Sequence, residues 1–396
     1  MNRRTVIIAI ILLLIIFGIG VALYFGAISP QSPRARQFFG NLPIIGGRAP
    51  LGGESPTPTP TPPSDQSRVS DYLLRQIVDK EVMAPAESNE RNSLLYLLRD
   101  SGHIVSSGFD GREERTVSNL TVLEVFDASW ASKKNSVAMF YHEGGVVKKF
   151  LNGVATGTRR TFLPQETAAF DWSPDGLSIA YLLKRAEDTA LVIADSQNRN
   201  PRVVYSTPIP DFTVSWAAKN TILLVSRPSG LAPSLILRFD LVSRSTSILL
   251  SGRRGVVVKP LPDASGFLFS QSSASGQAEL LARYTFGDRQ VTPLAVVTLA
   301  EKCAAAPRSK MVYCGVPRQP LGATLPDQWY AGTLSFSDRI VAIDPKDGSV
   351  TTLMEGVADV DVVSPFVSTD EQHLFFLDKK TSTLWRLDLA TTTPGQ

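Results

Sequence analysis

The chain has 396 residues and a formal net charge of +3, and 43% of its residues are hydrophobic, a composition typical of globular proteins. The charge is uneven, because residues 1–64 hold five arginines against one glutamate, and the rest of the chain sums to −1. A near-neutral main body lacks the basic surface that nucleic-acid binding needs, so the composition argues against nucleic acid as a partner.

An uncharged stretch from Thr5 to Gly26 follows two arginines at the amino terminus. A helix of this length reaches ~33 Å at about 1.5 Å per residue, the thickness of the hydrocarbon core of a bilayer. A cleaved signal peptide is the alternative, but its apolar region is normally shorter and ends in a small-x-small site, which does not follow here. We therefore expect residues 1–27 to form a transmembrane signal anchor, with residues 5–26 in the membrane.

The flanking charges give little information on orientation, because Arg3 and Arg4 precede the anchor and Arg34 and Arg36 follow it. A Pro/Thr-rich segment and a main body whose two cysteines are able to pair both suit an extracytoplasmic location. We expect a single-pass protein of the bacterial cell envelope, with its amino terminus in the cytoplasm and its main body outside.

The segment after the anchor, residues 28–69, lacks periodicity and is rich in Pro, Gly, Ser and Thr, with TPTPTPP at 57–63. Such a composition cannot bury a core and favours extended or polyproline II backbone. We expect a flexible linker, followed by a folded domain at residues 70–392 and a short tail at residues 393–396.

Within the folded domain short apolar runs alternate with clusters of Gly, Pro, Asp and Ser, which is typical of all-β structure. Only residues 71–82 (DYLLRQIVDKEV) allow a helix. The clearest unit is FDWSPDGLSIAYL at 170–182, in which Ser-Pro-Asp-Gly favours a tight turn between two strands. Trp172 and Ile179 of this unit are expected to fill the space between neighbouring sheets.

The layout of strand, turn and strand recurs along the chain. The equivalent positions are Ala84, Trp130, Trp172, Trp216, Leu261, Cys303 and Phe366. Five of the six steps between them are nearly even, and the step from Cys303 to Phe366 is longer than the others. Repeats of roughly 40–45 residues, with room for four strands each, predict a seven-bladed β-propeller. Six blades are the alternative, with residues 75–118 completing the last blade; either way the two ends of the domain are expected to meet.

FDWSPDGLSIAYL resembles the W-S-P-D-G-x-x-I-A-Y/F repeat of TolB-like (WD-type) β-propellers. The order of anchor, Pro/Thr tether and propeller also resembles a group of uncharacterised bacterial membrane-anchored propeller proteins. The segments that carry this second resemblance are LLRQIVDKEVMAP, SGHIVSSGFDG, EKCAAAPRSKMVYCGVP and LPDQWYAGTLSFSD. It covers roughly residues 1–392 and implies the fold and the anchoring without an activity.

The two cysteines, Cys303 and Cys314, fall on the first and second strands of their unit, where facing positions would allow a disulfide. Because we expect the domain to lie outside the cytoplasm, we expect the two cysteines to form a disulfide. Two free thiols are the alternative. No zinc pattern surrounds the cysteines. The three histidines are scattered along the chain, at His103, His142 and His373. We expect neither a metal nor a cofactor.

The one long step between repeats contains an insertion at 318–338, between the second and third strands of its unit. Its candidate binding residues are Asp327, Trp329, Tyr330 and Phe336. Large amphipathic side chains suit a recognition anchor, and long loops in compact domains tend to be functional or disordered. The alternative, which the sequence favours slightly, is that the aromatic pair plugs the domain.

Enzymatic activity is left open, although a non-enzymatic role is favoured, because the chain has no G-x-S-x-G, P-loop or H-E-x-x-H motif. We assign no catalytic residues. A hydrolase or lyase acting on a glycan at the pore face would need two acids from different blades. The candidates are Asp127, Asp171, Asp211 and Asp361.

The sequence contains three pairs of basic residues, Lys148–Lys149, Arg159–Arg160 and Arg253–Arg254. If these pairs line one face of the domain, they would attract an acidic polymer; the alternative is that they are ordinary solvated surface residues. The sequence thus predicts a membrane-anchored propeller that binds a protein or an envelope polymer, with a pore-face glycan hydrolase or lyase as the alternative.

Overall fold

The computed structural model describes residues 74–154, 160–319 and 324–389. The predicted anchor (residues 1–27), linker (28–69) and tail (393–396) lie outside these residues. Within the described ranges no helix is long and apolar enough to cross a membrane.

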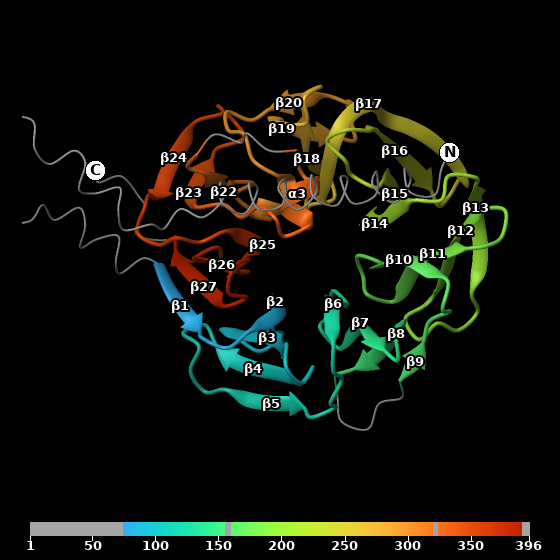
Figure 1. The fold of residues 1–396 in the computed structure, drawn as a ribbon, viewed down its shortest axis with the longest axis horizontal. Coiled ribbons are helices and arrows are strands. Elements are labelled where there is room, and N and C mark those ends of the chain that lie inside the picture. Colours follow the sequence, from blue (N-terminus) through green and yellow to red (C-terminus); the bar gives the residue numbers. More distant parts are fainter. Residues whose placement is uncertain (1–73, 155–159, 320–323, 390–396) are drawn as a thin grey trace, which may run out of the picture. The chain divides into compact units, whose positions relative to one another are not determined.

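The described residues form antiparallel sheets that follow one another in a ring (Figure 1). The first sheet contains β2 (Val82–Glu87), β3 (Ser93–Leu98), β4 (Ile104–Gly108) and β5 (Arg115–Ser118). The second contains β6 (Val125–Trp130), β7 (Ser136–Glu143), β8 (Val146–Gly153) and β9 (Thr161–Phe162). The third contains β10 (Thr167–Trp172), β11 (Ser178–Lys184), β12 (Thr189–Asp195) and β13 (Arg202–Thr207).

The next sheet has seven strands: β14 (Phe212–Ala218), β15 (Thr221–Ser226), β16 (Pro233–Asp240), β17 (Ser245–Pro260), β18 (Gly266–Ser272), β19 (Ala278–Thr285) and β20 (Val291–Pro293). After a short 3-10 helix, η2 (Ala300–Lys302), come β21 (Cys303–Ala305), β22 (Val312–Pro317), β23 (Asp338–Ile343) and β24 (Val350–Met354). A single-turn helix, α3 (Asp327–Tyr330), lies between β22 and β23. The last sheet contains β25 (Val362–Val367), β26 (His373–Asp378), β27 (Leu384–Asp388) and β1 (Leu74–Val78).

Strand β17 explains why one sheet has seven strands. The first part of this 16-residue strand pairs with β16, and its last part pairs with β18. Gly255 lies near the change of partner with a φ of +59°, and a Cβ at this position would lie 2.2 Å from Ser272 Oγ. Only glycine therefore fits there without displacing β18.

The repeated tryptophans join neighbouring sheets, as their spacing predicts. Trp130 Nε1 donates to the carbonyl of Ala84 at 2.6 Å, and Trp172 Nε1 donates to that of Ser129 at 3.0 Å. Trp172 and Ile179 share one buried cluster that spans the second and third sheets. The predicted turn also forms, because Asp175 accepts a hydrogen bond from the backbone N–H of Leu177 at 3.0 Å. The motif is thus a turn and core element.

The ring is closed by strands from the two ends of the domain. Figure 1 shows β1 beside β27, and the register pairs Leu74 with Leu387. The carbonyl of Phe109, in the first sheet, accepts a hydrogen bond from Arg386 of β27 at 3.1 Å. The expectation that the two ends meet is therefore confirmed.

The helix considered for residues 71–82 is wrong over its described part, because residues 74–78 form β1 and β2 begins at Val82. Leu74 and Val78 enter two different buried clusters, and the register of β1 shifts between Gln76 and Val78. Pairing with β27 buries both residues, and this tertiary gain overrides the local helical pattern.

Cys303 and Cys314 face each other across β21 and β22 and form a disulfide, with their Cα atoms 4.1 Å apart. Both side chains are fully buried. The bond closes a short loop and lies in the core shared by β21, β22 and β23.

Reduction of this disulfide should lower the free energy of unfolding by about 2–3 kcal/mol, because the bond restricts the unfolded chain. Urea titrations with and without dithiothreitol measure the loss. A double variant, Cys303→Ala and Cys314→Ala, is the control and should not respond to the reductant. Equal midpoints for the wild type in both conditions would contradict the prediction.

Candidate functional site

The insertion between β22 and β23 reaches across to the seven-stranded sheet. Leu325 N donates to the carbonyl of Gly276 at 2.8 Å, and the Leu325 carbonyl accepts from Ser272 Oγ at 2.6 Å. Asp327 Oδ2 accepts from the backbone N–H of Gly230 at 2.6 Å. The predicted site residue Asp327 therefore holds α3 against the connection between β15 and β16.

Trp329 and Phe336 are buried beneath the insertion, with exposed fractions of 1% and 8%. They form one cluster with Leu299 and Leu325. Trp329 Nε1 and the backbone N–H of Phe336 both donate to Asp361 Oδ2, at 3.0 and 2.9 Å. These two candidate residues therefore lie in the interior of the domain.

A buried ion cluster lies against these rings. Lys302 Nζ forms ion pairs with Asp361 and with Asp338, whose Oδ2 lies 2.7 Å away. All three side chains are fully buried. The ammonium also lies 5.4 Å from the ring centre of Trp329 and 5.1 Å from that of Phe336, within the range of a cation–π contact. Burial raises the pKa of Asp338 to about 6, against the opposing effect of Lys302.

Tyr330 points away from this interior, and 44% of its side chain is exposed. Its hydroxyl donates to Glu301 Oε1 at 2.7 Å, which connects α3 to η2. Burial is the main cause that raises the pKa of both groups. Of the four candidate residues, Tyr330 alone has a largely exposed side chain, while Asp327 makes a contact that positions the helix.

A recess with a volume of about 370 Å³ opens beside Tyr330 and Glu301. Val225 of β15 and Val256, Val257 and Val258 of β17 border it, together with Pro228. Thr213 and Ser215 of β14 also face it, and Arg227 stands in the connection that follows β15. A volume of this size suits a small ligand or a chain end.

Two further charged groups lie near Glu301. Burial lowers the pKa of Lys259 to about 8, and the Glu301 carboxylate opposes this shift. Lys259 Nζ donates to the carbonyl of Pro365 at 3.1 Å. Asp127 has an exposed side chain, yet the surrounding protein raises its pKa. The negative charge of Asp127 in turn raises the pKa of Glu301. The inner side of the ring thus gathers charges from β6, β17 and η2.

The other three acids considered for a pore-face pair make contacts in other parts of the domain. Asp361 belongs to the buried ion cluster, and Asp211 pairs with Lys184 at 3.0 Å on the surface. Asp171 accepts from the backbone N–H of Trp216 at 2.7 Å and from that of Trp172 at 2.9 Å, and so connects two sheets. Of the four acids, only Asp127 lies near Glu301.

Asp171 should make stability depend on pH, because burial raises its pKa in the folded state to about 6. The folded state then binds more protons than the unfolded chain, so this contribution falls as pH rises from about 4 to about 6. We expect Asp171→Asn to cost more stability at pH 4 than at pH 7, as measured by melting temperature. The exposed Asp211→Asn is the control. A cost that stays constant over this range would refute the assignment.

Two of the basic pairs lie on different sheets. Lys148 and Lys149 lie on β8, where Lys148 pairs with Glu143 and Lys149 donates to a carbonyl. Arg253 and Arg254 lie on β17, and Arg253 lies over the ring of Phe269. Arg160 is described and Arg159 lies outside the described residues. In the described ranges, no group of three or more His, Cys, Asp or Glu side chains could hold a metal.

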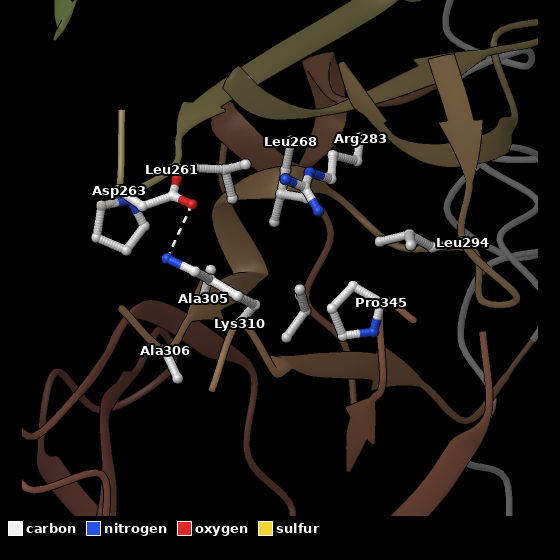
Figure 2. Close-up of a pocket in the computed structure, with 11 residues that line it drawn as sticks. Leu261, Asp263, Leu268, Arg283, Leu294, Ala305, Ala306, Lys310 and Pro345 are labelled. Carbon is white, nitrogen blue, oxygen red and sulfur yellow. Dashed lines mark ion pairs between the residues drawn. The ribbon is translucent and has the colours of Figure 1, made fainter. Parts of the chain in front are cut away.

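A second crevice separates β18 from the disulfide hairpin (Figure 2). Leu261, Leu268 and Leu294 line it, and an ion pair of 3.0 Å between Lys310 and Asp263 lies at one side. Its volume is only about 10 Å³, the space of about one water molecule. We place the candidate site in the recess beside Tyr330, because that recess is lined by a site residue that the sequence predicted.

No protein-family model and no curated protein matches the chain. Among solved structures, an oligogalacturonate lyase from Vibrio parahaemolyticus is 7% identical, with a TM-score of 0.54 over 81% of this chain and 92% of that one. The β-propeller domain of Cps50 (Swd1) from Myceliophteria thermophila is 11% identical, with a TM-score of 0.54 over 80% and 100%. TolB from Acinetobacter baumannii is 14% identical, with a TM-score of 0.43 over 78% of each chain.

At these identities the similarity is one of fold. The ring of antiparallel sheets and the matching propeller structures show that residues 74–389 form a β-propeller. The resemblance to WD-type β-propellers is confirmed at the level of fold.

Sequence reasoning missed Arg227, Lys259, Glu301 and Lys302. Arg227 lies in a loop, Lys259 in a strand and the adjacent Glu301 and Lys302 in η2, and no motif or spacing marks any of them. Only the closure of the ring and the path of the insertion bring these residues to the site.

Proposed function

We propose that this chain is a membrane-anchored, extracytoplasmic β-propeller that binds a protein or an envelope polymer, and that the recess beside Tyr330 is its binding site. The observation that carries the proposal is a ligand-sized recess with an uncommitted cationic side chain, Arg227, at a place where an insertion adds a wall. Anchoring rests on the uncharged stretch at residues 5–26.

The proposal includes seven blades. The six sheets contain five of four strands and one of seven, in which β17 pairs on both sides. If β17 is counted as the last strand of one blade and the first of the next, every blade has four strands. The positions at which the repeats begin then agree with the even steps of the sequence.

The buried part of the insertion supports a binding role for its exposed part. Trp329 and Phe336 fix the insertion in the core, and Asp327 fixes α3 at Gly230. Tyr330 is thereby held in one position, with its hydroxyl on Glu301. A rigid aromatic side chain loses little entropy on binding. The insertion therefore combines the plug and the recognition anchor that the sequence left as alternatives.

A glycan hydrolase or lyase at the pore face is the second candidate. The specific observation in its favour is the group of Asp127, Lys259 and Glu301, whose pKa values are all shifted by the surrounding protein. Shifted pKa values cluster at functional sites. Some solved propellers that share the fold are oligogalacturonate lyases. The binding role is favoured, because Lys259 and Glu301 are each already hydrogen-bonded within the protein.

A photocrosslinking experiment tests the binding role. A photoreactive amino acid replaces Leu231 in the anchored full-length chain, and Val242 serves as the matched control. Both are exposed aliphatic residues, at 64% and 75%, and they flank opposite ends of β16. We expect a specific adduct from position 231 and none from position 242. Adducts from both or neither would contradict the proposal, and oligosaccharide cleavage that is lost in Glu301→Gln would establish the enzyme instead.

A further inference from the structure

The recess beside Tyr330 offers few free hydrogen-bond donors. Thr213 Oγ1 donates to the carbonyl of Val225 at 3.2 Å, and the Tyr330 hydroxyl donates to Glu301. The Ser215 hydroxyl is hydrogen-bonded to the carboxylate of Asp171. Each of these hydroxyl protons is thus committed within the protein, and only the oxygen lone pairs remain for a ligand.

Arg227 is the exception. Its side chain is exposed and lines the recess, and within the described ranges its guanidinium makes neither an ion pair nor a hydrogen bond. A guanidinium presents a planar fork of N–H groups that matches a carboxylate with two parallel hydrogen bonds. Among the side chains that line the recess, Arg227 is therefore the one free strong donor, and it favours an anion.

Apolar groups also line the recess. Val225, Val256 and Val257 border it but are at least 95% buried, so Pro228, Val258 and the ring of Tyr330 supply its accessible apolar groups. A sugar, which carries a hydroxyl on most of its carbons, would leave many of these hydroxyls without partners along such a lining. The lining instead suits a ligand with an apolar side chain next to its anionic group.

The second oxygen of Glu301 adds one acceptor. The Tyr330 hydroxyl donates a hydrogen bond to Oε1, and Oε2 has no hydrogen-bond partner among the described residues. A backbone N–H close to the anionic group of the ligand would supply the matching donor. An anion, an apolar side chain and an amide N–H occur together at the carboxyl terminus of a peptide.

We propose that the recess binds the free C-terminal carboxylate of a protein partner whose last residue is aliphatic, with the carboxylate on Arg227 and the side chain against Pro228, Val258 and Tyr330. This inference rests on the proposed binding function and names the chemistry of its ligand. The volume of about 370 Å³ accepts a chain end rather than a folded surface.

The test uses the purified full-length chain in detergent and fluorescein-labelled hexapeptides of the form Gly-Ser-Gly-Ser-Gly-X. Position X is Val, Leu, Asp or Lys, and each peptide is made with a free carboxylate and as an amide. Fluorescence anisotropy measures the dissociation constants. We expect the free Val and Leu peptides to bind most tightly, and amidation to weaken binding by about 10- to 100-fold, the effect of losing a charged hydrogen-bonded pair.

The variant Arg227→Gln should show the same loss, with an unchanged melting temperature because the side chain is exposed. Arg202→Gln is the matched control, since Arg202 is exposed on β13 in a different sheet, and it should bind as the wild type does. Equal affinities for free and amidated peptides, or wild-type affinity in Arg227→Gln, would overturn the inference.

The experiment also separates this inference from the proposed function. If position 231 still captures a partner while no peptide binds, the C-terminal inference fails and the binding module stands. If a neutral or an acidic oligosaccharide binds instead, and Arg227→Gln or Val258→Asp abolishes that binding, the inference fails in favour of an envelope polymer. If nothing is captured and no peptide binds, both are overturned.

Discussion

A chain that ends at Lys379 should fail to fold, because β27 occupies an interior position in its sheet between β26 and β1. Its removal leaves β1 without a strand partner and leaves one edge of β26 unpaired. Leu384 and Leu387 are fully buried and belong to two different core clusters, so both would lose packing. The loss would open the ring at the point where its two ends meet, and we expect no cooperative melting transition.

A circular permutant is the matched control for this truncation. Residue 389 is joined to residue 74 by a short linker, and the new ends are placed between residues 379 and 380. This chain retains every strand, because β27 and β1 are antiparallel neighbours with Leu387 opposite Leu74. Calorimetry should show one cooperative transition for residues 74–389 and for the permutant. A truncated chain that melts cooperatively would show that the ring does not depend on this closure.

Much of the propeller could be predicted from sequence because its strands and turns are specified locally. Ser-Pro-Asp-Gly sets a turn through Asp175 and the positive φ of Gly176, whatever surrounds it. The repeat of Trp130 and Trp172 marks positions that meet between sheets. The strand at residues 74–78 could not be found in this way, because its partner β27 lies at the opposite end of the domain sequence and only the closed ring selects it.

For the same reason, only the insertion among the parts of the candidate site could be predicted from the sequence. The insertion with Trp329 and Tyr330 stands out, because it breaks the spacing of the repeats. Arg227 follows β15 and Glu301 belongs to η2, and their positions follow from the path of the chain around the ring. A single charge in a loop has no periodic context, so no sequence pattern distinguishes a free guanidinium from a paired one.

Replacing Lys302 by methionine should lower the free energy of unfolding by about 3–5 kcal/mol, because it leaves Asp338 and Asp361 buried without their cation. Methionine retains most of the volume, so the loss reports charge rather than a cavity. Lys310→Met is the control: its ion pair with Asp263 is partly exposed, and such pairs contribute about 0–1 kcal/mol. Urea titrations of both variants give the comparison.

The pH dependence of Lys302→Met distinguishes charge from packing. Without the ammonium, the folded state should bind a proton on Asp338 more readily than the unfolded chain does, because burial raises the pKa of this carboxyl and Lys302 no longer opposes the shift. Its stability relative to the wild type should therefore recover as pH falls from 8 to 5. Adding Asp338→Asn should recover part of the loss at pH 8, since one buried charge is then removed. A deficit that stays constant with pH and is unchanged by Asp338→Asn would mean that Lys302 acts through its packing against Trp329 and Phe336.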